Sequence, residues 1–486
     1  MSVIKIENLT FAYPGSADNV FENLNLQLDT DWKLGFVGRN GRGKTTLLKL
    51  LTGEYEYSGR IESRAQFDYF PYSVDGSEGG VLDVLRSVCP EAEDWQIERE
   101  LSLLGIDSGA LVRPFSTLSN GERTKALLAA LFLRDGRFLL IDEPTNHLDA
   151  AARSKVSSYL SRKRGFILVS HDRSFLDGCV DHILSLNRSG AEVRSGNFSA
   201  WFADFNARQE AEASLNERLK RDIGRLKQSA ERTSGWSDRV EASKKGALDK
   251  GYVGHKAAKM MKRSKNIEAR RQQAIEKKSA LLKDSETAEP LKLFPLAYHS
   301  ETLVRFEDVS IVYGGHEVCS HVRFDVLRGE RVALSGGNGS GKSSLIKLLC
   351  GEKIPHSGTA VIGSGLIISY VSQDTSGLSG NLSDYASEHG IDESLFKTIL
   401  RKLDFEREQF GKDISEFSGG QKKKVLIARS LCERAHLYVW DEPLNFIDIY
   451  SRMQLENLII EFAPTMVFVE HDAAFRRNIA TKTIEL

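Results

Sequence analysis

The sequence predicts an α/β protein that contains one domain twice, with a long α-helical hairpin linker between the copies. A glycine-rich segment, GRNGRGKTT at Gly38–Thr46, recurs as GGNGSGKSS at Gly336–Ser344. Other motifs recur around both segments in the same order, at a nearly constant offset of about 300 residues. Between the copies lies a charged stretch with helical spacing and few Gly or Pro residues. We expect domains at 1–198 and 301–486, joined by a linker at 199–300.

Length and charge restrict the possible partners. A chain of 486 residues is long enough for two or three domains with substantial cores. The formal net charge is −1, so the overall charge indicates no partner. The segment 208–286, however, contains about 21 Lys and Arg against about 12 Asp and Glu. A basic segment within an acidic remainder predicts a polyanionic partner for that segment.

Several classes of protein are excluded by pattern. The five cysteines are scattered without a CxxC pair, which favours a reducing cytoplasm. No apolar run reaches the roughly 18–20 residues that a membrane span needs, and the N-terminus lacks a leader pattern. We therefore expect a cytoplasmic protein that does not enter the membrane. The sequence stops at Leu486, so we expect no basic extension after the second copy.

Each glycine-rich segment lies where a phosphate-binding loop is expected. It follows an apolar strand, Leu34–Val37 or Arg331–Ser335, and a helix begins at Thr45 in the first copy. Four further apolar runs predict buried parallel strands, at Phe138–Ile141, Phe166–Val169, Leu437–Trp440 and Met466–Val469.

The linker predicts two helices and a tip. A helix is expected from Ser199 to Thr233, because only Gly224 interrupts the charged helical spacing. Four glycines then predict a tip loop at about 234–254. A second basic helix is expected from about Lys256 to Lys283.

The glycine-rich segments predict nucleotide binding. Glycines let backbone N–H groups approach a phosphate, and the helix N-terminus favours negative charge there. Lys44 and Lys342 are placed to reach the β- and γ-phosphates of ATP, while Thr45 and Ser343 are placed to ligate Mg²⁺. An ordinary loop is the alternative, which two copies make improbable. The predicted ATP-binding loop residues are Gly38, Asn40, Gly41, Gly43, Lys44, Thr45, Thr46, Gly336, Asn338, Gly339, Gly341, Lys342, Ser343 and Ser344.

Two carboxylates end a buried strand in each copy. Asp142 and Asp441 are expected to hold Mg²⁺, and Glu143 and Glu442 to polarise the water that attacks ATP. A helix N-cap is the commoner role for such a pair, but the spacing from each phosphate loop argues against it. We therefore predict ATP hydrolysis.

LSNGE at Leu118–Glu122 and FSGGQ at Phe417–Gln421 resemble the signature loops of the ABC ATPase superfamily, and the resemblance covers both halves. In that family the signature residues contact the γ-phosphate that the opposite domain binds, so each site would contain residues of both halves. The resemblance assigns this role to Ser119, Gly121, Ser418, Gly419 and Gly420.

Other positions match the family one by one. His171 and His471 follow apolar strands and match its γ-phosphate sensor; a lone histidine is more often structural, but the paired positions favour the sensor. Tyr13 and Tyr313 match its adenine-stacking aromatic, although a core or surface tyrosine is the alternative.

One position departs from the family pattern. Gln373 matches the glutamine that contacts Mg²⁺ and water, but the alignment of Phe67–Tyr72 with Ile368–Gln373 places Tyr72 there in the first half. Tyrosine has no carboxamide. We expect the first site to hydrolyse ATP more slowly, or to position water with another group.

Two fused ABC domains and a basic helical linker resemble the ABC-F group, and four segments resemble its antibiotic-resistance branch of Lsa/Vga type. These are DTDWKLGFVGRN at Asp29–Asn40, GRNGRGKTTLL at Gly38–Leu48, WDEPLNFIDIYSRMQ at Trp440–Gln454 and FVEHD at Phe468–Asp472. PLNFID at Pro443–Asp448 departs from the PTNHLD found at Pro144–Asp149 in the way that this branch does.

The resemblance implies a monomer whose halves close on ATP and bind the 70S ribosome at the tRNA exit site. The linker tip would then approach the peptidyl-transferase centre, among 23S rRNA and tRNA, and dislodge lincosamides, pleuromutilins or streptogramin A. The predicted tip residues are Trp236, Arg239, Lys244, Lys245 and Lys256. Trp236 could instead pack against the hairpin, and the linker's basic residues could be a solvated helix face.

Three other functions stay open. A housekeeping ABC-F translation factor shares all the ATP chemistry. The ATPase subunit of a drug exporter would not need a basic hairpin. A DNA-repair or condensin-like ATPase would need a far longer coiled coil.

Overall fold

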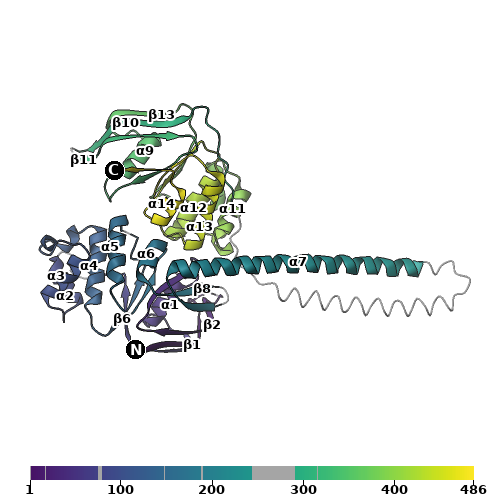
Figure 1. Ribbon diagram of the computed structural model, residues 1–486, viewed down its shortest axis with the longest axis horizontal. Coiled ribbons are helices and arrows are strands. Elements are labelled where there is room, and N and C mark those ends of the chain that lie inside the picture. The colour runs from purple at the N-terminus through teal and green to yellow at the C-terminus, as the bar shows by residue number, and fades with distance from the viewer. Residues whose placement is uncertain are drawn as a thin grey trace, which may run out of the picture. The chain divides into compact units, whose positions relative to one another are not determined.

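The computed structural model describes residues 2–16, 18–74, 79–146, 148–187, 190–242, 291–314 and 316–486. The chain forms two compact units, one made of Met1–Trp201 with Ala288–Leu486 and the other of Phe202–Thr287. The first unit contains two α/β halves, and helix α7 leads out of the first half (Figure 1). This confirms the predicted α/β class with the domain repeated.

The first half contains two sheets. An antiparallel sheet has the order β2-β1-β4, with β1 at Val3–Phe11, β2 at Phe21–Asp29 and β4 at Ser58–Glu62. A six-stranded sheet has the order β5-β6-β7-β3-β8-β9 and is parallel except for β9. Its strands are β3 (Lys33–Gly38), β5 (Gln66–Phe70), β6 (Arg137–Asp142), β7 (Phe166–Val169), β8 (His182–Asn187) and β9 (Gly190–Ser195).

The helices of the first half begin at capping residues. Ser119 precedes α4, and its Oγ accepts a hydrogen bond from the Glu122 N–H at 3.3 Å while the Glu122 carboxylate accepts from the Ser119 N–H at 2.9 Å. Asp149 and Asp172 cap α5 and α6. The helices are α1 (Lys44–Leu51), α2 (Val81–Val88), α3 (Asp94–Leu103), α4 (Asn120–Phe132), α5 (Ala150–Leu160) and α6 (Arg173–Cys179).

The second half repeats this arrangement. Its antiparallel sheet has the order β11-β10-β13, and its parallel sheet the order β14-β15-β16-β12-β17. The strands are β10 (Thr302–Tyr313), β11 (His316–Leu327), β12 (Arg331–Ser335), β13 (His356–Ile362), β14 (Ile368–Val371), β15 (Leu437–Asp441), β16 (Met466–Val469) and β17 (Lys482–Glu485). The helices are α9 (Lys342–Leu349), α10 (Leu382–Glu388), α11 (Glu393–Lys402), α12 (Gly419–Cys432), α13 (Ile449–Phe462) and α14 (Ala473–Ile479).

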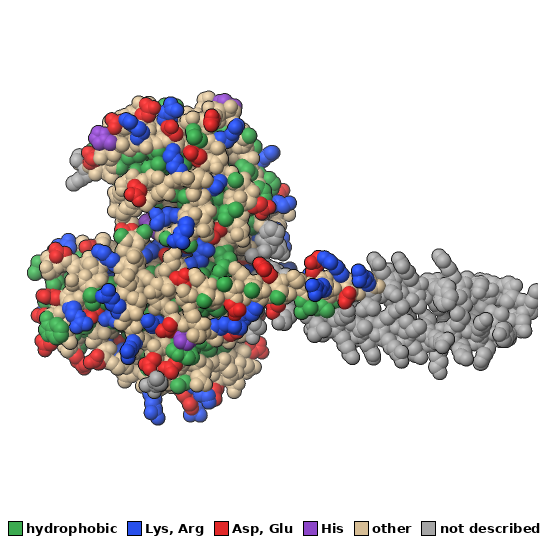
Figure 2. Space-filling model, in the orientation of Figure 1, with side chains coloured by type: hydrophobic (Ala, Val, Ile, Leu, Met, Phe, Trp, Pro, Cys, Tyr) green, Lys and Arg blue, Asp and Glu red, His purple; other side chains and the backbone are tan. Residues whose placement is uncertain are grey.

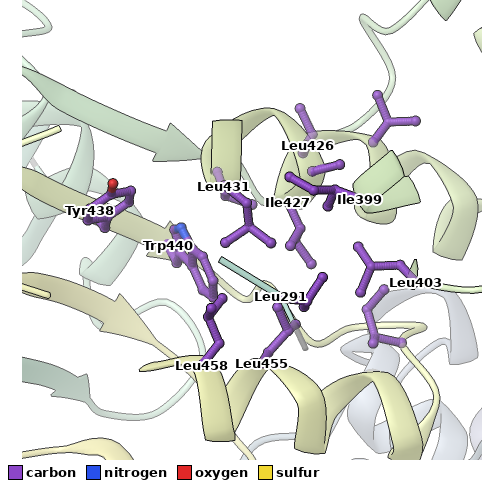
Figure 3. Packing of buried hydrophobic residues seen from close by; sticks show 14 of the residues in the cluster. Leu291, Ile399, Leu403, Leu426, Ile427, Leu431, Tyr438, Trp440, Leu455 and Leu458 are labelled. Carbon is purple, nitrogen blue, oxygen red and sulfur yellow. The ribbon is translucent and has the colours of Figure 1, made fainter. Parts of the chain in front are cut away.

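A large apolar core supports strand β15 (Figure 3). Trp440 of β15 is fully buried against the helices, and its indole N–H donates to Oγ of Ser430 at 3.0 Å. Leu455 and Leu458 of α13 pack in the same cluster. This packing holds the end of β15 in a defined position. Asp441 is the last residue of the strand, and Glu442 directly follows it.

Helix α7 spans Phe198–Ala242. A helix was expected only to Thr233, so the predicted tip loop is wrong for residues 234–242. One glycine, Gly235, weakens a helix by only about 1 kcal/mol and does not end it. Trp236 and Arg239 therefore lie in the helix, whereas Lys244, Lys245 and Lys256 lie outside the described residues.

The described side chains of α7 separate into two faces. Arg218, Arg221 and Arg225 are exposed, whereas Leu219 and Ile223 are buried. On the visible face of the α/β halves, basic and acidic side chains are intermixed (Figure 2). None of the helices in the described residues is long and apolar enough to cross a membrane.

Candidate nucleotide-binding sites

Each phosphate loop turns from a strand into a helix at a left-handed glycine. Gly43 and Gly341 precede α1 and α9 with φ of 86° and 87°. A Cβ atom at Gly43 would lie 2.6 Å from Cγ1 of Val20, so only glycine fits. The loop lysines fold back in the same way: Nζ of Lys44 donates to the Gly38 carbonyl at 2.8 Å, and Nζ of Lys342 to the Gly336 carbonyl at 2.9 Å.

The hydroxyl after each loop lysine meets the carboxylate that ends β6 or β15, a strand that lies two positions away in the sheet from the strand before the loop. Oγ1 of Thr45 donates to Oδ2 of Asp142 at 2.7 Å, and Tyr69 donates to the same oxygen at 3.0 Å. In the second half, burial raises the pKa of Asp441, and a hydrogen bond with Ser343 opposes this rise. Oδ1 of Asp441 is buried with no hydrogen-bond partner among the described residues.

These oxygens fit Mg²⁺. A hydroxyl and a carboxylate are the ligand types that Mg²⁺ prefers, and it usually keeps water and phosphate oxygens as its other ligands. The described residues accordingly contain no group of three or more His, Cys, Asp or Glu side chains that could hold a metal alone.

Two cavities, of about 520 and 460 Å³, are each lined by residues of both halves. They fall within the range of small-molecule sites. We call the cavity at Lys44 the first site and the cavity at Lys342 the second site. Predicted residues that line the first site are Tyr13, Asn40, Gly41, Gly43, Lys44, Thr45, Thr46, Asp142, Glu143, His171, Ser418, Gly419 and Gly420. Predicted residues that line the second site are Ser119, Gly121, Asn338, Gly339, Gly341, Lys342, Ser343, Ser344, Gln373, Glu442 and His471.

The structure thus brings each phosphate loop together with the signature loop of the other half. At the first site Nδ2 of Asn40 donates to the Phe446 carbonyl of the second half at 2.8 Å. A Cβ atom at Gly420 would lie 2.6 Å from that same carbonyl oxygen. Gly420 and Phe446 both belong to the second half, so the signature glycine leaves this carbonyl accessible to Asn40, whose Nδ2 would lie 3.4 Å from an added Cβ.

The two histidines lie beside the two glutamates. Nε2 of His171 lies 3.3 Å from Oε1 of Glu143, and Nε2 of His471 lies 3.4 Å from Oε1 of Glu442. Burial holds the pKa of His171 well below its usual value, so its imidazole is neutral. Both glutamates adopt left-handed backbone conformations, with φ of 49° and 46°.

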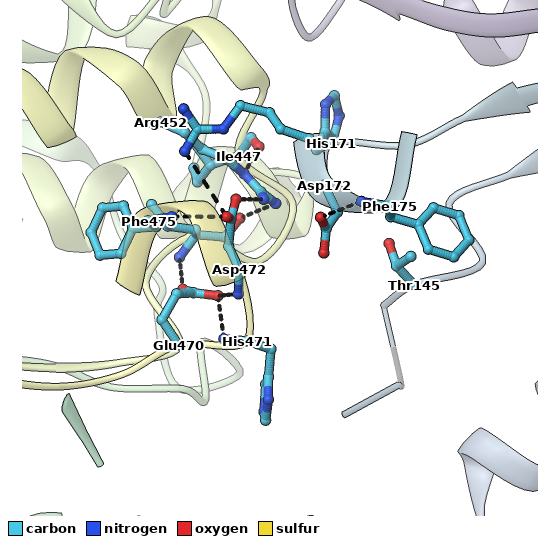
Figure 4. Close-up of polar contacts among 12 residues, drawn as sticks. Thr145, His171, Asp172, Phe175, Ile447, Arg452, Glu470, His471, Asp472 and Phe475 are labelled. Carbon is cyan, nitrogen blue, oxygen red and sulfur yellow. Dashed lines mark hydrogen bonds and ion pairs between the residues drawn. The ribbon is translucent and has the colours of Figure 1, made fainter. Parts of the chain in front are cut away.

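A buried ion pair fixes each histidine loop (Figure 4). Nη1 of Arg452 donates to Oδ2 of Asp472 at 3.1 Å, and Oδ1 of Asp472 caps α14 by accepting from the Phe475 N–H at 3.0 Å. Arg153 and Asp172 form the same pair in the first half, at 3.0 Å. The second half adds Glu470, whose carboxylate accepts from the backbone N–H groups of three residues, Leu444, His471 and Asp472.

The two glutamates differ in the hydrogen bonds they accept. Oε2 of Glu442 accepts from Nε2 of Gln373 at 2.8 Å and from Nδ2 of Asn445 at 2.6 Å. Oε1 of Glu143 is buried without a hydrogen-bond partner among the described residues. Asn146, which is equivalent to Asn445, lines the second site instead.

Strand register shows which residue of the first half stands at the position of Gln373. Phe70 pairs with Ile141 as Val371 pairs with Trp440, so Tyr72 and Gln373 are equivalent. The Tyr72 hydroxyl donates to the Leu127 carbonyl at 3.1 Å, in α4. The Tyr72 hydroxyl therefore donates its proton to an acceptor in its own half. Tyr72 is not among the described residues that line the first site.

These contacts move the two pKa values in opposite directions. Burial, with Asp142 nearby, raises the pKa of Glu143 to about 8. Burial also favours the protonated form of Glu442, but hydrogen bonds and charge from His471, with the bonds from Asn445 and Gln373, bring its pKa below the usual value. At neutral pH Glu442 is ionised, whereas Glu143 is largely protonated.

The two predicted aromatic residues are not equivalent in the structure. The Tyr13 hydroxyl lies 2.7 Å from Oγ1 of Thr46, and the ring lines the first site. Tyr313 ends β10 with an exposed side chain and is not among the described residues that line the second site.

Sequence reasoning did not select several residues that the structure brings to the sites. Asn445 could have been found, because it lies three positions after Glu442 in a matched motif. Asp404, Phe405, Glu406 and Gln409 of the second half line the first site, but they precede the signature loop in a segment without a recognisable motif. Lys423 lies within α12 and donates to the Asp441 carbonyl at 3.2 Å.

Comparison with known proteins agrees with this arrangement. The family model described as "ABC transporter" matches residues 21–146 and 319–445. The chain is 26% identical to the putative ATP-binding protein YdiF of Bacillus subtilis, over 100% of this chain and 80% of that protein. It is 29% identical to the ATP-binding protein Uup of Caulobacter vibrioides, over 97% of this chain and 75% of that protein.

Solved structures share the fold. The archaeal ribosome recycling factor aABCE1, solved in complex with the ribosomal stalk protein aP1, matches with a TM-score of 0.65 and 20% identity, over 98% of this chain and 87% of that one. A structure titled RNase-L Inhibitor matches with a TM-score of 0.64 and 20% identity, over 99% of this chain and 87% of that one. Two matched ABC segments, two composite sites and relatives that match nearly the whole of this chain lead to one conclusion: the chain belongs to the ABC transporter family, as an ATP-binding and ATP-hydrolysing protein of the ABC-F type with two ABC ATPase domains.

Proposed function

We propose that this protein is an ATP-driven ribosome-binding factor that acts at the tRNA exit site in the cytoplasm. The observation that carries the proposal is the composite construction of both sites, since residues on either side of each cavity belong to different halves. ATP bound between a phosphate loop and the opposite signature loop stabilises the closed form, and loss of the γ-phosphate weakens it. Hydrolysis therefore sets how long the closed form lasts.

The chemistry of each site follows from its residues. Lys44 and Lys342 bind phosphate oxygens, and Ser119 and Ser418 contact the γ-phosphate from the other half. The ionised carboxylate of Glu442 orients a water molecule and accepts its proton as the water oxygen bonds to the γ-phosphorus and the bond to ADP breaks. His471, beside it, senses the γ-phosphate.

Mg²⁺ would be held by Thr45 and Asp142 at the first site, and by Ser343, Asp441 and Gln373 at the second. When bound, it neutralises charge on the phosphates. Asp441, with its unpaired buried oxygen, is the residue best prepared for this role.

The charge of the linker supports a ribosomal partner. Arg218, Arg221 and Arg225 of α7 are exposed and lie at helical spacing, so they share one face. Arg221 pairs with Glu217, which leaves a net basic stripe suited to RNA phosphates. The aABCE1 structure, which shares this fold, is titled as that of a ribosome recycling factor, and this likeness supports the proposal of a ribosomal partner.

We further propose that the protein protects the ribosome from drugs of the peptidyl-transferase centre, namely lincosamides, pleuromutilins and streptogramin A. The support is the resemblance of four segments to the Lsa/Vga branch. The predicted tip residues Trp236, Arg239, Lys244, Lys245 and Lys256 would act there.

A housekeeping translation factor is the second candidate. The observation that favours it is that relatives such as Uup and YheS, matched over 97% and 94% of this chain, bear only the names of ATP-binding proteins. The two candidates share all the ATP chemistry and differ in what the linker tip does.

Drug susceptibility separates them. A drug-sensitive Gram-positive host would express the wild-type chain or the Glu143→Gln/Glu442→Gln form. Tolerance to lincosamides or pleuromutilins from the wild type alone is the expected result. Unchanged susceptibility to every drug of this class, with ribosome binding intact, would contradict protection and favour the housekeeping factor.

A further inference from the structure

A salt bridge joins the two halves at the first site, and the part of the chain that the structure describes contains no counterpart of it at the second. Arg39 of the first phosphate loop pairs with Asp404 of the second half, and the guanidinium lies 5.5 Å from the centre of the Tyr450 ring. The loop alignment makes Gly337 the equivalent of Arg39. Both residues of the pair are largely buried, so water screens the attraction little.

The equivalent of Asp404 is also a glycine. Helices α3 and α11 end with the same hydrogen bonds, Leu104 N–H to the Glu100 carbonyl and Leu403 N–H to the Ile399 carbonyl. The next residue is left-handed in both: Gly105 has φ of 68° and Asp404 has φ of 59°. A left-handed backbone is less favourable for aspartate than for glycine. The carboxylate of Asp404 offsets this cost by forming the ion pair with Arg39, which the second site lacks because Gly105 has no side chain.

A second ion pair between the halves is unequal in the same sense. Arg173, which follows the first histidine loop, donates through Nη1 to Oε2 of Glu456 in α13 at 3.2 Å. The histidine loops align Arg173 with Ala473. The shared Arg–Asp pairs, Arg153 with Asp172 and Arg452 with Asp472, align Glu456 with Ser157. Neither equivalent can form an ion pair.

The second half instead supports its own catalytic loops. Nζ of Lys423 donates to the Ser372 carbonyl at 2.7 Å and to the Asp441 carbonyl at 3.2 Å. These carbonyls directly precede Gln373 and Glu442, so one ammonium group ties the two loops together. The equivalent residue in α4 is Thr124, whose hydroxyl donates to the Asn120 carbonyl within its own helix.

We propose that the two sites have different tasks: the first stays closed around its nucleotide through several turnovers, held by the Arg39–Asp404 pair, while the second opens and closes with each hydrolysis. This inference rests on the proposed ATP-driven cycle and names its regulation. The first site has the Arg39–Asp404 pair, which resists opening, and its glutamate lacks the hydrogen bonds that Glu442 accepts. The second site has the positioned glutamate and no equivalent pairs.

Nucleotide dissociation tests this division. The full wild-type chain, which hydrolyses ATP, would be loaded with a fluorescent ATP analogue and Mg²⁺, then chased with excess ATP. Two release phases are expected. Lys44→Ala in this background should abolish the slow phase, and Lys342→Ala the fast one.

The chain supplies its own matched variants. Arg39→Gly with Asp404→Gly gives the first site the residues of the second, and both partners are removed together so that no charge is left unpaired. Gly337→Arg with Gly105→Asp transfers the pair to the second site. A Cβ atom at Gly337 would have Oδ2 of Asp149 as its nearest neighbour, at 3.9 Å, whereas one at Gly105 would lie 2.5 Å from Nζ of Lys155, so the end of that flexible side chain must move. Thermal unfolding checks that each variant folds.

The expected results are opposite for the two variants. Removing the pair should accelerate the slow phase about tenfold, the effect of about 1.4 kcal/mol. Transferring it should slow the fast phase by a similar factor. A single release phase in the parent chain, or a slow phase that Arg39→Gly/Asp404→Gly leaves unchanged, would overturn the division of tasks alone. Failure of every form to bind the analogue would overturn the proposed ATP cycle as well.

Discussion

Gln373 donates a hydrogen bond of 2.8 Å to the carboxylate of Glu442, and the described residues of the first half contain no equivalent of this bond. Tyr72 stands at the glutamine position there, with its hydroxyl bound to the Leu127 carbonyl. The difference concerns the one carboxylate per site that is placed to activate water. The two sites share the phosphate-loop lysine and the hydroxyl that follows it, and they differ in the residues that donate hydrogen bonds to the catalytic glutamate.

Single glutamate substitutions should therefore have unequal effects. Glu442→Gln is expected to lower steady-state ATPase activity by about 10²- to 10⁴-fold, the usual contribution of a general base. The fall in ATPase activity caused by Glu143→Gln should be several-fold smaller. Phosphate release measured for each single variant tests this, and equal residual activities would contradict it.

Asn445 should contribute to turnover more than Asn146 does. Nδ2 of Asn445 donates to Glu442 at 2.6 Å, so Asn445→Ala removes a hydrogen bond that orients the base. We expect kcat to fall about tenfold with little change in KM, because such a loss affects the chemical step more than binding. Asn146→Ala is the matched comparison: it removes no hydrogen bond to Glu143 among the described contacts, and because Asn146 lines the second site we expect it to change KM rather than kcat. A similar loss of kcat in the control would refute the assignment.

The titration of Glu143 should appear in stability. Burial raises its pKa to about 8 from the ordinary 4.5, so the folded state binds a proton that the unfolded chain releases. Its stabilising contribution is fully present below about pH 4.5 and is lost as the pH rises through about 8. Glu143→Gln is neutral at every pH. Chemical unfolding across this window should show the wild type losing stability relative to the variant as pH increases; a constant difference would disprove the shift.

Lys423 should act as a positioning residue of the second site. Burial lowers its pKa to about 8, which shows how fully the ammonium is enclosed between the two catalytic loops. Lys423→Thr, the residue of the first half, is expected to lower kcat about tenfold at constant KM. Lys423→Arg, which keeps donors, should recover part of the rate. If both variants changed only the melting temperature, the lysine would be structural and not positioning.

The parts that the sequence predicts correctly are those with strong local signals. Periodicity and spacing predict the repeated domain and buried strands such as Phe166–Val169. They also predict that Tyr72 and Gln373 occupy equivalent positions in the two halves. Helix α7 runs beyond the expected end at Thr233, because a single glycine only weakens a helix.

The contacts between the halves could not be predicted in the same way. Asp404 reaches Arg39 only because two segments far apart in the sequence meet after folding. Lys423 looks like any basic helix residue until α12 packs against the ends of β14 and β15. Such residues depend on tertiary packing, which leaves no periodic or motif signal in a single sequence.

Ribosome binding by the ATP-locked protein tests the central claim most directly. Glu143→Gln/Glu442→Gln protein would be sedimented with purified 70S ribosomes in the presence of ATP, of ADP or of no nucleotide, at several salt concentrations. We predict co-sedimentation with ATP only, which weakens steeply as salt increases because linker cations bind RNA phosphates. Equal binding in all three nucleotide states, or none in any, would contradict an ATP-driven ribosome factor.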